Sequence, residues 1–283
     1  MRPIKEQLIL ITGATDGIGK ITAQKLASMG ASVLIHGRSH EKCESTLNDI
    51  REKTGNKKLG SYVADFSSLS EVRTMAEQIS TVHSKLHVLI NNAGVGPPKP
   101  AGKNPLSKDG YEICFAVNYL APFLLTHLLV PLLKRGAPSR IVNISSAAQE
   151  PIDFDMMLER SYNPWKTYGQ SKLALTIFTF DLAEQLKDNG VTVNCLHPGS
   201  LLDTKMVRES FGMAQGSAES GAEVEVYAAT DPALEGRTGR YFDQKQEARA
   251  HRQAYEPEVR RTLRELSEEL TGIQQVQLEP RNL

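Results

Sequence analysis

The chain has 283 residues, and its 33 lysine and arginine residues balance 33 aspartate and glutamate residues. This balance excludes the strong positive field that would attract nucleic acid or anionic lipid to the whole surface. Hydrophobic residues make up 40% and charged residues 23% of the chain, which is typical of a globular protein with a sizeable core.

The three cysteines and the apolar segments bear on the compartment. Cys43, Cys114 and Cys195 form no CxxC pair and indicate reduced thiols, so a cytoplasmic location is the default expectation. The residues before the first apolar run contain no signal-peptide core. The longest apolar stretch, 120–133, contains two prolines and a histidine and is too short to cross a bilayer. We therefore expect no membrane segment.

Short apolar runs alternate with helical patterns along the chain. Strands are predicted at residues 8–12, 32–36, 61–64, 88–91, 140–145, 191–196 and 240–242. Helices are predicted at residues 17–29, 41–53, 69–84, 111–134, 165–189 and 256–270. This alternation predicts one doubly wound, Rossmann-type α/β domain over residues 1–283, with a mostly parallel sheet of about seven strands flanked by helices. The tail, 273–283, has little apolar pattern and is expected to be disordered.

A glycine-rich segment follows the first predicted strand and opens the first helix. Gly13 permits a tight turn, Gly17 lets the backbone approach a pyrophosphate, and Gly19 permits close packing of helix on strand. The helix N-terminus offers N–H groups to the anion. We favour nucleotide binding over an ordinary glycine-rich turn, with predicted contacts from Gly13, Thr15, Asp16, Gly17, Ile18 and Gly19.

The end of the second strand indicates which dinucleotide binds. An NAD site places a carboxylate there for the adenosine ribose, whereas this strand ends in His36-Gly37-Arg38-Ser39. Arg38 can bind a 2′-phosphate or stack on adenine, so NADP(H) is favoured and NAD(H) is less expected. The alternatives are a solvated arginine and a His36 that is packed rather than catalytic.

Two more strand ends supply candidate nucleotide contacts. Asp65 follows the third strand, with Phe66 beside it, and it either accepts a hydrogen bond from adenine or acts as a turn residue. After the fourth strand come Asn92, Ala93 and Gly94. Small residues there let the backbone approach a ribose, while an asparagine side chain fixes the turn.

The pair Tyr168 and Lys172 is the strongest catalytic signal. A four-residue separation on a helix stacks both side chains on one face. A positive charge at roughly 4 Å, at an effective dielectric of about 20, favours phenolate by about 4 kcal/mol. That would lower the phenol pKa by up to about three units, toward useful acid–base chemistry. The alternative is a lysine that only lies along the surface beside a tyrosine.

These residues together resemble the short-chain dehydrogenase/reductase superfamily. The resemblance covers residues 8 to about 272 and follows the family's order. It rests on Thr-Gly-x-x-x-Gly-Ile-Gly at 12–19, Asn-Asn-Ala-Gly at 91–94, Asn118, Ser145-Ser146, Tyr168-x-x-x-Lys172 and His197-Pro198-Gly199. The segments 162–165 and 239–242 are most similar to the retinol dehydrogenase-like branch. Members of that branch often carry an N-terminal membrane anchor, which we do not expect here, so the substrate is not carried over.

The resemblance implies a catalytic set of Asn118, Ser146, Tyr168 and Lys172. Tyr168 would be the acid in carbonyl reduction and the base in alcohol oxidation, and Lys172 would lower its pKa and hold the nicotinamide ribose. Ser146 would hydrogen-bond the reacting oxygen, with Ser145 as the rival assignment. Asn118 would support a water-linked proton relay to the lysine, or else make a hydrogen bond that kinks its helix.

The resemblance also implies nicotinamide contacts from the sixth strand end. Pro198 and Gly199 would cross the nicotinamide face, Thr204 would bond its carboxamide, and His197 would be structural. Residues of about 200–220 are the expected substrate loop, with 205–217 as a candidate lid. The insert 149–166 either roofs the substrate pocket or packs as a surface loop.

The predicted function is hydride transfer, dependent on NADP(H), between the nicotinamide and a carbonyl or alcohol carbon. The substrate is expected to be a lipophilic or small aldehyde or ketone, or the corresponding alcohol. The rival is a non-catalytic NADP(H)-sensing or scaffold protein on the same fold. We expect no metal site and no nucleic-acid partner, and pairing through the long helices into a dimer or tetramer is plausible.

Overall fold

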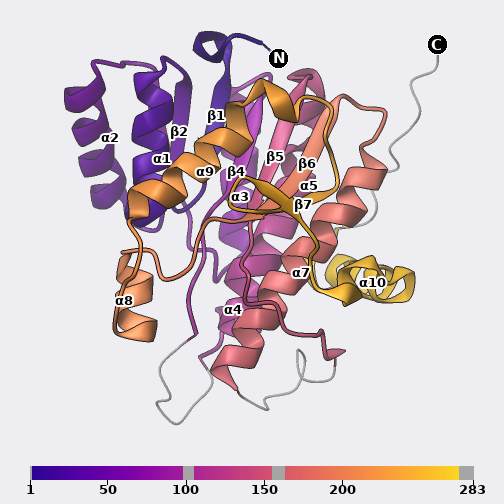
Figure 1. Cartoon of the computed structure of the whole chain (residues 1–283). Helices are drawn as coiled ribbons and strands as arrows, with labels where there is room; N and C mark the ends of the chain where they lie inside the picture. The colour runs from indigo at the N-terminus through magenta and orange to yellow at the C-terminus, as the bar shows by residue number, and fades with distance from the viewer. Residues whose placement is uncertain (1, 98–104, 155–162, 274–283) are drawn as a thin grey trace.

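The computed structural model of the protein describes residues 2–97, 105–154 and 163–273 (Figure 1). Within these residues, eight strands form one sheet in the order β3-β2-β1-β4-β5-β6-β7-β8. Strands β1 to β7 are parallel, with Ile9 beside Val33 and Val88, and β8 is antiparallel to β7. Their bounds are β1 Leu8–Ile11, β2 Ser32–Gly37, β3 Leu59–Val63, β4 Val88–Asn91, β5 Ser139–Ile144, β6 Val191–His197, β7 Arg240–Asp243 and β8 Gln246–Ala248.

The Rossmann-type prediction is confirmed, but the helices at 205–211 and 218–230 were not predicted, and two strands differ from the prediction. Strand β3 begins two residues earlier than predicted, because its residues are only half-buried and give a weak apolar signal. Strand β8 was not predicted, since it has three residues of which Gln246 and Glu247 are exposed. A short polar edge strand of this kind carries no buried-strand pattern.

Helices cover both faces of the sheet (Figure 1). One core joins the sheet to α1 Gly17–Ser28, α2 His40–Thr54 and α9 Ala218–Thr230, through residues such as Leu26, Leu47 and Val224. The other joins it to α3 Leu69–Val82, α5 Ala121–Arg135 and α7 Pro164–Gln185. Strands buried on both faces read as continuous apolar runs, which is why most of them could be predicted.

Side-chain caps fix where several helices begin. Asp16 accepts a hydrogen bond from Gly17 N at 2.8 Å at the start of α1, and Ser39 accepts one from Lys42 N at 3.3 Å at the start of α2. Asn163 caps α7, and Pro164 occupies its first position. These caps satisfy N–H groups that a helix cannot satisfy internally. They also fix the chain at the ends of the strands, where the candidate site lies.

The predicted helix at 111–134 is one continuous helical segment with a wide turn inside it. It comprises α4 Ile113–Phe115, the π-helical η2 Ala116–Leu120 and α5. The segment Ile113–Arg135 has 23 residues and a mean hydropathy of 1.8, so its length and composition would allow it to cross a membrane. However, 83% of its apolar window is buried inside the protein, which makes this weak support for a membrane span.

Buried polar side chains tie the central helices to the sheet. Asn91 on β4 donates to Asn143 Oδ1 on β5 at 2.8 Å and to Thr126 Oγ1 on α5 at 3.0 Å. Asn143 in turn donates to Thr179 Oγ1 on α7 at 2.8 Å. Bonds of this kind are costly to leave unpaired in a core. They therefore fix α5, and α7 with the predicted catalytic residues Tyr168 and Lys172, against β4 and β5.

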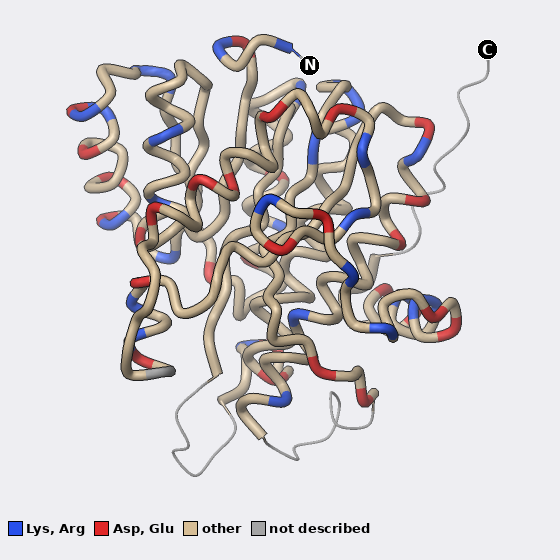
Figure 2. The backbone as a smooth tube through the Cα atoms, viewed as in Figure 1, with Lys and Arg blue, Asp and Glu red and all other residues tan. Residues whose placement is uncertain are grey.

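The last helix, α10 Pro257–Thr271, packs its apolar side on the domain, with Leu263 only 1% exposed. Arg264 pairs with Asp181 of α7 at 2.8 Å, and Ser267 hydrogen-bonds the phenol of Tyr119 at 2.6 Å. Lysines, arginines and acidic residues are interspersed along its outer side (Figure 2). The helix is thus an integral part of the fold.

Short helices complete the described chain: η1 Ile4–Glu6, α8 Lys205–Phe211, η3 Pro232–Leu234 and η4 Arg252–Tyr255.

The end of α5 yields a stability prediction. A Cβ at Gly136 would lie 2.0 Å from the carbonyl oxygen of Leu86, a backbone atom that cannot rotate away. We expect Gly136→Ala to lower the free energy of unfolding by about 2 kcal/mol or more. At Gly60 the added methyl would meet only the end of the Leu34 side chain at 3.1 Å, so Gly60→Ala should change it by less than about 1 kcal/mol. Urea unfolding of both variants measures this, and equal stabilities would contradict it.

Candidate active site

The predicted site residues gather at the carboxyl ends of the parallel strands. Strand β1 is flanked by β2 and β4. From β1 the successive strands are added toward one edge of the sheet up to β3 and toward the other edge from β4 onward, so the order in which strands are added reverses between β1 and β4. Ligands bind at such a switch point, outside the carboxyl ends. The N-terminus of α7 and the short helix α8 lie at this end of the molecule, the lower end in Figure 1.

The glycine-rich loop is shaped by close contact with the segment after β4. Gly13 has a φ of 66°, and a Cβ there would lie 2.7 Å from Ala93 Cα. A Cβ at Gly19 would lie 2.3 Å from the Asn92 side-chain nitrogen. Neither position leaves room for a side chain, and Gly13 also has a backbone conformation that favours glycine. Glycine is therefore required at both. Gly17 has a φ of 54° and faces Thr204.

Thr12 and Asn92 hold the two loops together. The Thr12 hydroxyl oxygen accepts hydrogen bonds from the backbone N–H groups of Asn92 and Ala93, both at 3.0 Å. The Asn92 side chain returns a bond to the Thr12 carbonyl at 2.7 Å. Asn92 therefore fixes the turn, as predicted. Thr12 is a positioning residue, whereas in the sequence it was recognised only as the first residue of the glycine-rich motif.

The adenosine side of the site lies at the ends of β2 and β3. Arg38 is exposed, directly before α2. Asp65 accepts a hydrogen bond from Ser67 N at 3.0 Å and pairs with Lys108 at 3.2 Å, so it acts as the turn residue that the sequence offered as an alternative. Phe66 is 2% exposed, so its ring belongs to the core and only its backbone is available to a nucleotide.

Lys172 is buried on α7 behind Tyr168. Its ammonium donates to the carbonyl oxygen of Ile144 at 2.9 Å and lies 5.8 Å from the centre of the Tyr168 ring. A Cβ at Gly94 would come within 3.6 Å of the same nitrogen. The predicted pair is therefore brought together on one helical face, with Gly94 beside the lysine ammonium.

The pKa values of the pair differ from the sequence expectation. Burial raises the pKa of Tyr168 to about 12, although a hydrogen bond with Ser146 lowers it. Burial also lowers the pKa of Lys172 to about 8. The predicted lowering of the phenol pKa assumed an ammonium at roughly 4 Å. Here the ammonium is directed at Ile144, and desolvation of the phenolate dominates.

The two adjacent serines have separate roles. Ser145 is 3% exposed and donates to the Lys172 carbonyl at 2.9 Å, and its hydroxyl also bonds Thr176 at 2.8 Å. Its side chain thus serves the packing of β5 on α7. Ser146 accepts from Ala148 N at 3.0 Å, and of the two serines it is the one that lowers the pKa of the Tyr168 phenol. Because the Ser145 hydroxyl is committed to α7, Ser146 stays the serine expected to face a reacting oxygen.

Asn118 lies in the π-helical turn η2 and binds the loop that follows Gly94. Its side-chain oxygen accepts from Val95 N at 2.7 Å, and its nitrogen donates to Val95 O and to Ser171 Oγ, both at 3.0 Å. The amide therefore holds this loop beside α7. None of these bonds goes to the backbone of its own helix, so the expected helix-kinking bond is not what the side chain makes here, and the water-linked relay stays a prediction.

The segment after β6 faces the glycine-rich loop. Pro198 is buried and Gly199 has a φ of 129°. Thr204 caps α8 by accepting from Val207 N at 3.2 Å, and its methyl group would lie 3.4 Å from a Cβ at Gly17. His197 bonds Ser200 at 3.1 Å, in keeping with a structural role. Part of the candidate lid is thus helix α8. In the insert, residues 155–162 lie outside the described residues, as does the tail from 274 onward.

Comparisons with known proteins agree with this geometry. The profile of the short chain dehydrogenase family matches residues 7–215. Human retinol dehydrogenase 13 is 37% identical over 289 residues, which cover 96% of this chain and 86% of that protein. Human polyprenol dehydrogenase is 34% identical over 296 residues, 98% of this chain and 88% of that protein. The solved Pseudomonas aeruginosa RhlG/NADP active-site complex has a TM-score of 0.69 at 28% identity, covering 86% of this chain and 97% of that one.

The chain belongs to the short-chain dehydrogenase family. The predicted similarity to retinol dehydrogenases is thereby confirmed, and with it an oxidoreductase fold that binds a nicotinamide cofactor.

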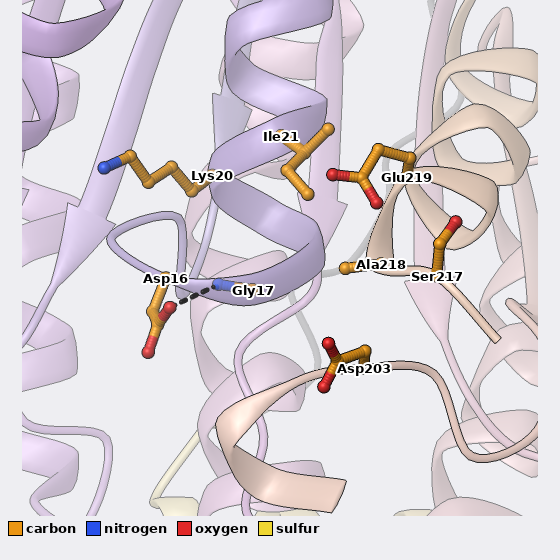
Figure 3. Close-up of a pocket in the computed structure, with 8 residues that line it drawn as sticks. All are labelled: Asp16, Gly17, Lys20, Ile21, Asp203, Ser217, Ala218 and Glu219. Carbon is orange, nitrogen blue, oxygen red and sulfur yellow. Dashed lines mark hydrogen bonds between the residues drawn. The ribbon is translucent and has the colours of Figure 1, made fainter. Parts of the chain in front are cut away.

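This short-chain dehydrogenase has a cavity of about 300 Å³ beside the N-terminus of α1 (Figure 3). Asp16 bonds the backbone of Gly17 there, and Asp203 and Glu219 approach from the other side. The cavity is lined by Asp16, Gly17, Lys20, Ile21, Asp203, Ser217, Ala218 and Glu219. Three of these side chains are carboxylates, while the Lys20 ammonium pairs with Asp49 at 2.6 Å. None of the predicted catalytic residues lines the cavity. In the described part of the chain, no cluster of three potential metal ligands occurs.

A buried carboxyl group lies on α9, and no pattern in the sequence indicated it. Glu225 is 0% exposed, and its Oε2 accepts from the Thr22 hydroxyl of α1 at 2.8 Å. Its Oε1 has no hydrogen-bond partner among the described residues. Burial raises the pKa of Glu225 to about 8, although the bond to Thr22 and the charge of Lys172 lower it. The group is therefore protonated at neutral pH.

This raised pKa makes a testable contribution to stability. Because the folded pKa of about 8 exceeds the unfolded value, the unfolded chain loses this proton first as the pH rises. The wild type should thus lose stability relative to Glu225→Gln from about pH 4.5 to pH 8, by up to about 1.4 kcal/mol per pH unit. Above pH 8 the difference should level off. Urea unfolding of both proteins at pH 5, 6.5 and 8 measures it, and a difference that does not change with pH would contradict it.

Proposed function

We propose that the protein is an NADP(H)-dependent oxidoreductase that transfers a hydride between the nicotinamide and the carbonyl or alcohol carbon of a lipophilic substrate. The observation that carries this proposal is the Lys172 ammonium, buried 5.8 Å from the centre of the Tyr168 ring, with Ser146 placed so that it lowers the pKa of the phenol. These groups share the carboxyl-terminal end of the sheet with the glycine-rich loop. A protein that only bound the nucleotide would not need them together.

The side chains divide the work of carbonyl reduction. When bound, the cofactor supplies the hydride to the carbonyl carbon. Because its pKa of about 12 keeps Tyr168 protonated at neutral pH, its hydroxyl can donate a proton to the carbonyl oxygen, which completes the alcohol. Ser146 donates a hydrogen bond to the same oxygen as negative charge develops. The Lys172 ammonium stabilises the phenolate left behind, and alcohol oxidation uses the same groups in reverse.

The residues around the first two strands fit an NADP(H) molecule. The backbone at Gly13, Gly17 and Gly19 leaves space that any Cβ would obstruct or strain, next to the N-terminus of α1. Arg38 is exposed beside the N-terminus of α2, whose dipole adds to its positive charge. Both would favour a 2′-phosphate, so NADP(H) is preferred over NAD(H). RhlG, the relative solved as an NADP complex, supports the same choice.

The substrate class follows from two relatives and the rim of the site. Retinol dehydrogenase 13 and polyprenol dehydrogenase are named for lipophilic alcohols. In this chain, α8 carries Met206 against the loop after β4, where a Cβ at Gly96 would lie 3.0 Å from the methionine side chain. Met213, just after α8, is 62% exposed. We therefore propose a lipophilic alcohol and its aldehyde or ketone as the substrate pair. A cytoplasmic location and a dimeric or tetrameric state stay predictions.

Tyr168 can be tested directly. We expect Tyr168→Phe to lower kcat at least a hundredfold, because general acid catalysis contributes roughly 10²–10⁴-fold, while NADPH affinity changes little. Tyr62→Phe serves as the matched control, because it removes a partly buried phenol that bonds His83 and lies on β3, whereas Tyr168 lies on α7. The assay is NADPH consumption with retinoid, steroid, aliphatic and quinone carbonyls. NADPH binding without turnover of any compound would favour the sensing role.

Arg38 is predicted to set the cofactor preference. We expect Arg38→Asp to reduce NADPH affinity by at least tenfold and to improve NADH affinity, because a carboxylate repels the 2′-phosphate and can accept the ribose hydroxyls. Arg51→Asp, at an exposed position in the last turn of α2, is the control for charge alone. Fluorescence titration with both cofactors measures the ratio. An unchanged ratio in Arg38→Asp would show that another group reads the phosphate.

A further inference from the structure

We infer that His36 is a positioning residue for the dinucleotide, whose single ring ties the glycine-rich loop after β1 to the turn after β3. This inference rests on the proposed NADP(H) function and deepens it. The two tied segments would meet different parts of one ligand, the diphosphate and the adenosine. His36 itself would touch neither the substrate nor the reacting atoms.

The contacts of His36 link three neighbouring strands. Its Nδ1 accepts a hydrogen bond from Gly13 N at 3.1 Å, and its Nε2 donates to the carbonyl oxygen of Ala64 at 3.0 Å. Its own carbonyl accepts from Ala14 N at 2.9 Å. His36 therefore binds two consecutive N–H groups of the glycine-rich loop and, on the opposite side of the ring, the residue before Asp65.

These contacts specify one form of the imidazole. Because Gly13 N is a donor, Nδ1 must carry the lone pair, and because Ala64 offers a carbonyl oxygen, Nε2 must carry the hydrogen. Only the neutral Nε2–H tautomer satisfies both partners. Burial, together with the positive charge of Arg38, lowers the pKa of His36 to about 4. The hydrogen bond to Ala64 and the charge of Asp65 oppose this lowering without outweighing it, so the ring stays neutral at physiological pH.

The ring is held firmly enough to transmit position. It is 2% exposed and stacks on Phe66, with ring centres 4.1 Å apart and planes 17° apart. Phe66 therefore acts on the site through His36 rather than by contact of its ring with adenine. The backbone supports the same link, since Ala64 N donates to Gly37 O at 3.2 Å.

A fixed distance between these two loops matters for a ligand that spans both. Gly13 lies where the diphosphate would pass, while Arg38 and Asp65 flank the adenosine. Holding both loops before binding reduces the ordering that the ligand would otherwise impose, and this raises affinity. Ser146 follows β5, and Tyr168 and Lys172 lie on α7. Because β1 and β4 separate β5 from β2, the effect of His36 should fall on cofactor binding and not on proton transfer.

Three variants separate the two hydrogen bonds. His36→Phe keeps an aromatic ring on Phe66 but loses both bonds, and we expect NADPH to bind about tenfold more weakly, because the two loops are then not held in place before binding. His36→Asn keeps an acceptor near the Nδ1 position, and His36→Gln keeps a donor near the Nε2 position. Both should lie between the wild type and His36→Phe.

The readouts distinguish positioning from a general loss of structure. The affinity for 2′,5′-ADP, which lacks the nicotinamide half, should fall by the same factor as that for NADPH, while kcat at saturating NADPH changes little. His83→Phe is the matched control, because this partly buried histidine bonds Tyr62 on the outer side of β3. Thermal unfolding of each variant shows whether it is folded. If His36→Phe does not fold, His36→Asn and His36→Gln carry the same comparison.

The tautomer provides a test without substitution. Nitrogen NMR of the histidine side chains should show His36 in the neutral Nε2–H form at pH 7. An imidazolium or an Nδ1–H form would overturn the inference, as would folded His36 variants that bind NADPH and 2′,5′-ADP like the wild type. A wild-type protein that fails to bind NADPH would instead overturn the proposed function, and the inference with it.

Discussion

The closest backbone approach at the site joins the loops after β1 and β4, and the arrangement of the site depends on it. Gly13 and Ala93 meet at a distance that leaves no room for a side chain, and the Thr12 hydroxyl bonds both N–H groups of the facing segment. This contact holds the start of α1 at the switch point of the sheet. It also directs the chain after β4 toward Val95, which Asn118 then binds from the π-helical turn. One tight contact thus aligns the nucleotide loop with the helices that carry the chemistry.

Burial, more than mutual attraction, governs the electrostatics of Tyr168 and Lys172. Each group is more easily kept neutral inside the protein than in water, so the phenol pKa rises and the ammonium pKa falls. Glu225, on the other side of the sheet, follows the same rule and is protonated at neutral pH. A site of this kind begins with a neutral proton donor. Negative charge that develops beside Lys172 during reduction would then be stabilised in a poorly solvated environment, where charge interactions are strong.

Much of the fold could be predicted because buried parallel strands read as continuous apolar runs and glycine-rich turns carry motifs. The apolar pattern weakens where a strand is half-exposed, as in β3, or short and polar, as in β8. The predicted start of β3 is therefore two residues too far along the chain, and β8 was not predicted at all. The candidate site divides in a similar way. Gly13 was predicted because its backbone conformation demands glycine, whereas the buried ring of Phe66 was expected beside a nucleotide. Spacing alone does not report which side of a turn a ring occupies.

The sequence by itself determined the class of fold, the order of the motifs and the pairing of Tyr168 with Lys172 on one helical face, because these follow from local periodicity and spacing. Only the tertiary structure decided which of two adjacent serines packs β5 on α7, which direction the Lys172 ammonium takes and what His36 holds together. Each of these depends on groups distant in the chain, such as Ile144 and Ala64, that meet through packing of the sheet. Desolvation likewise depends on the whole surrounding shell, so the direction of a buried pKa shift could not be read from neighbouring residues alone.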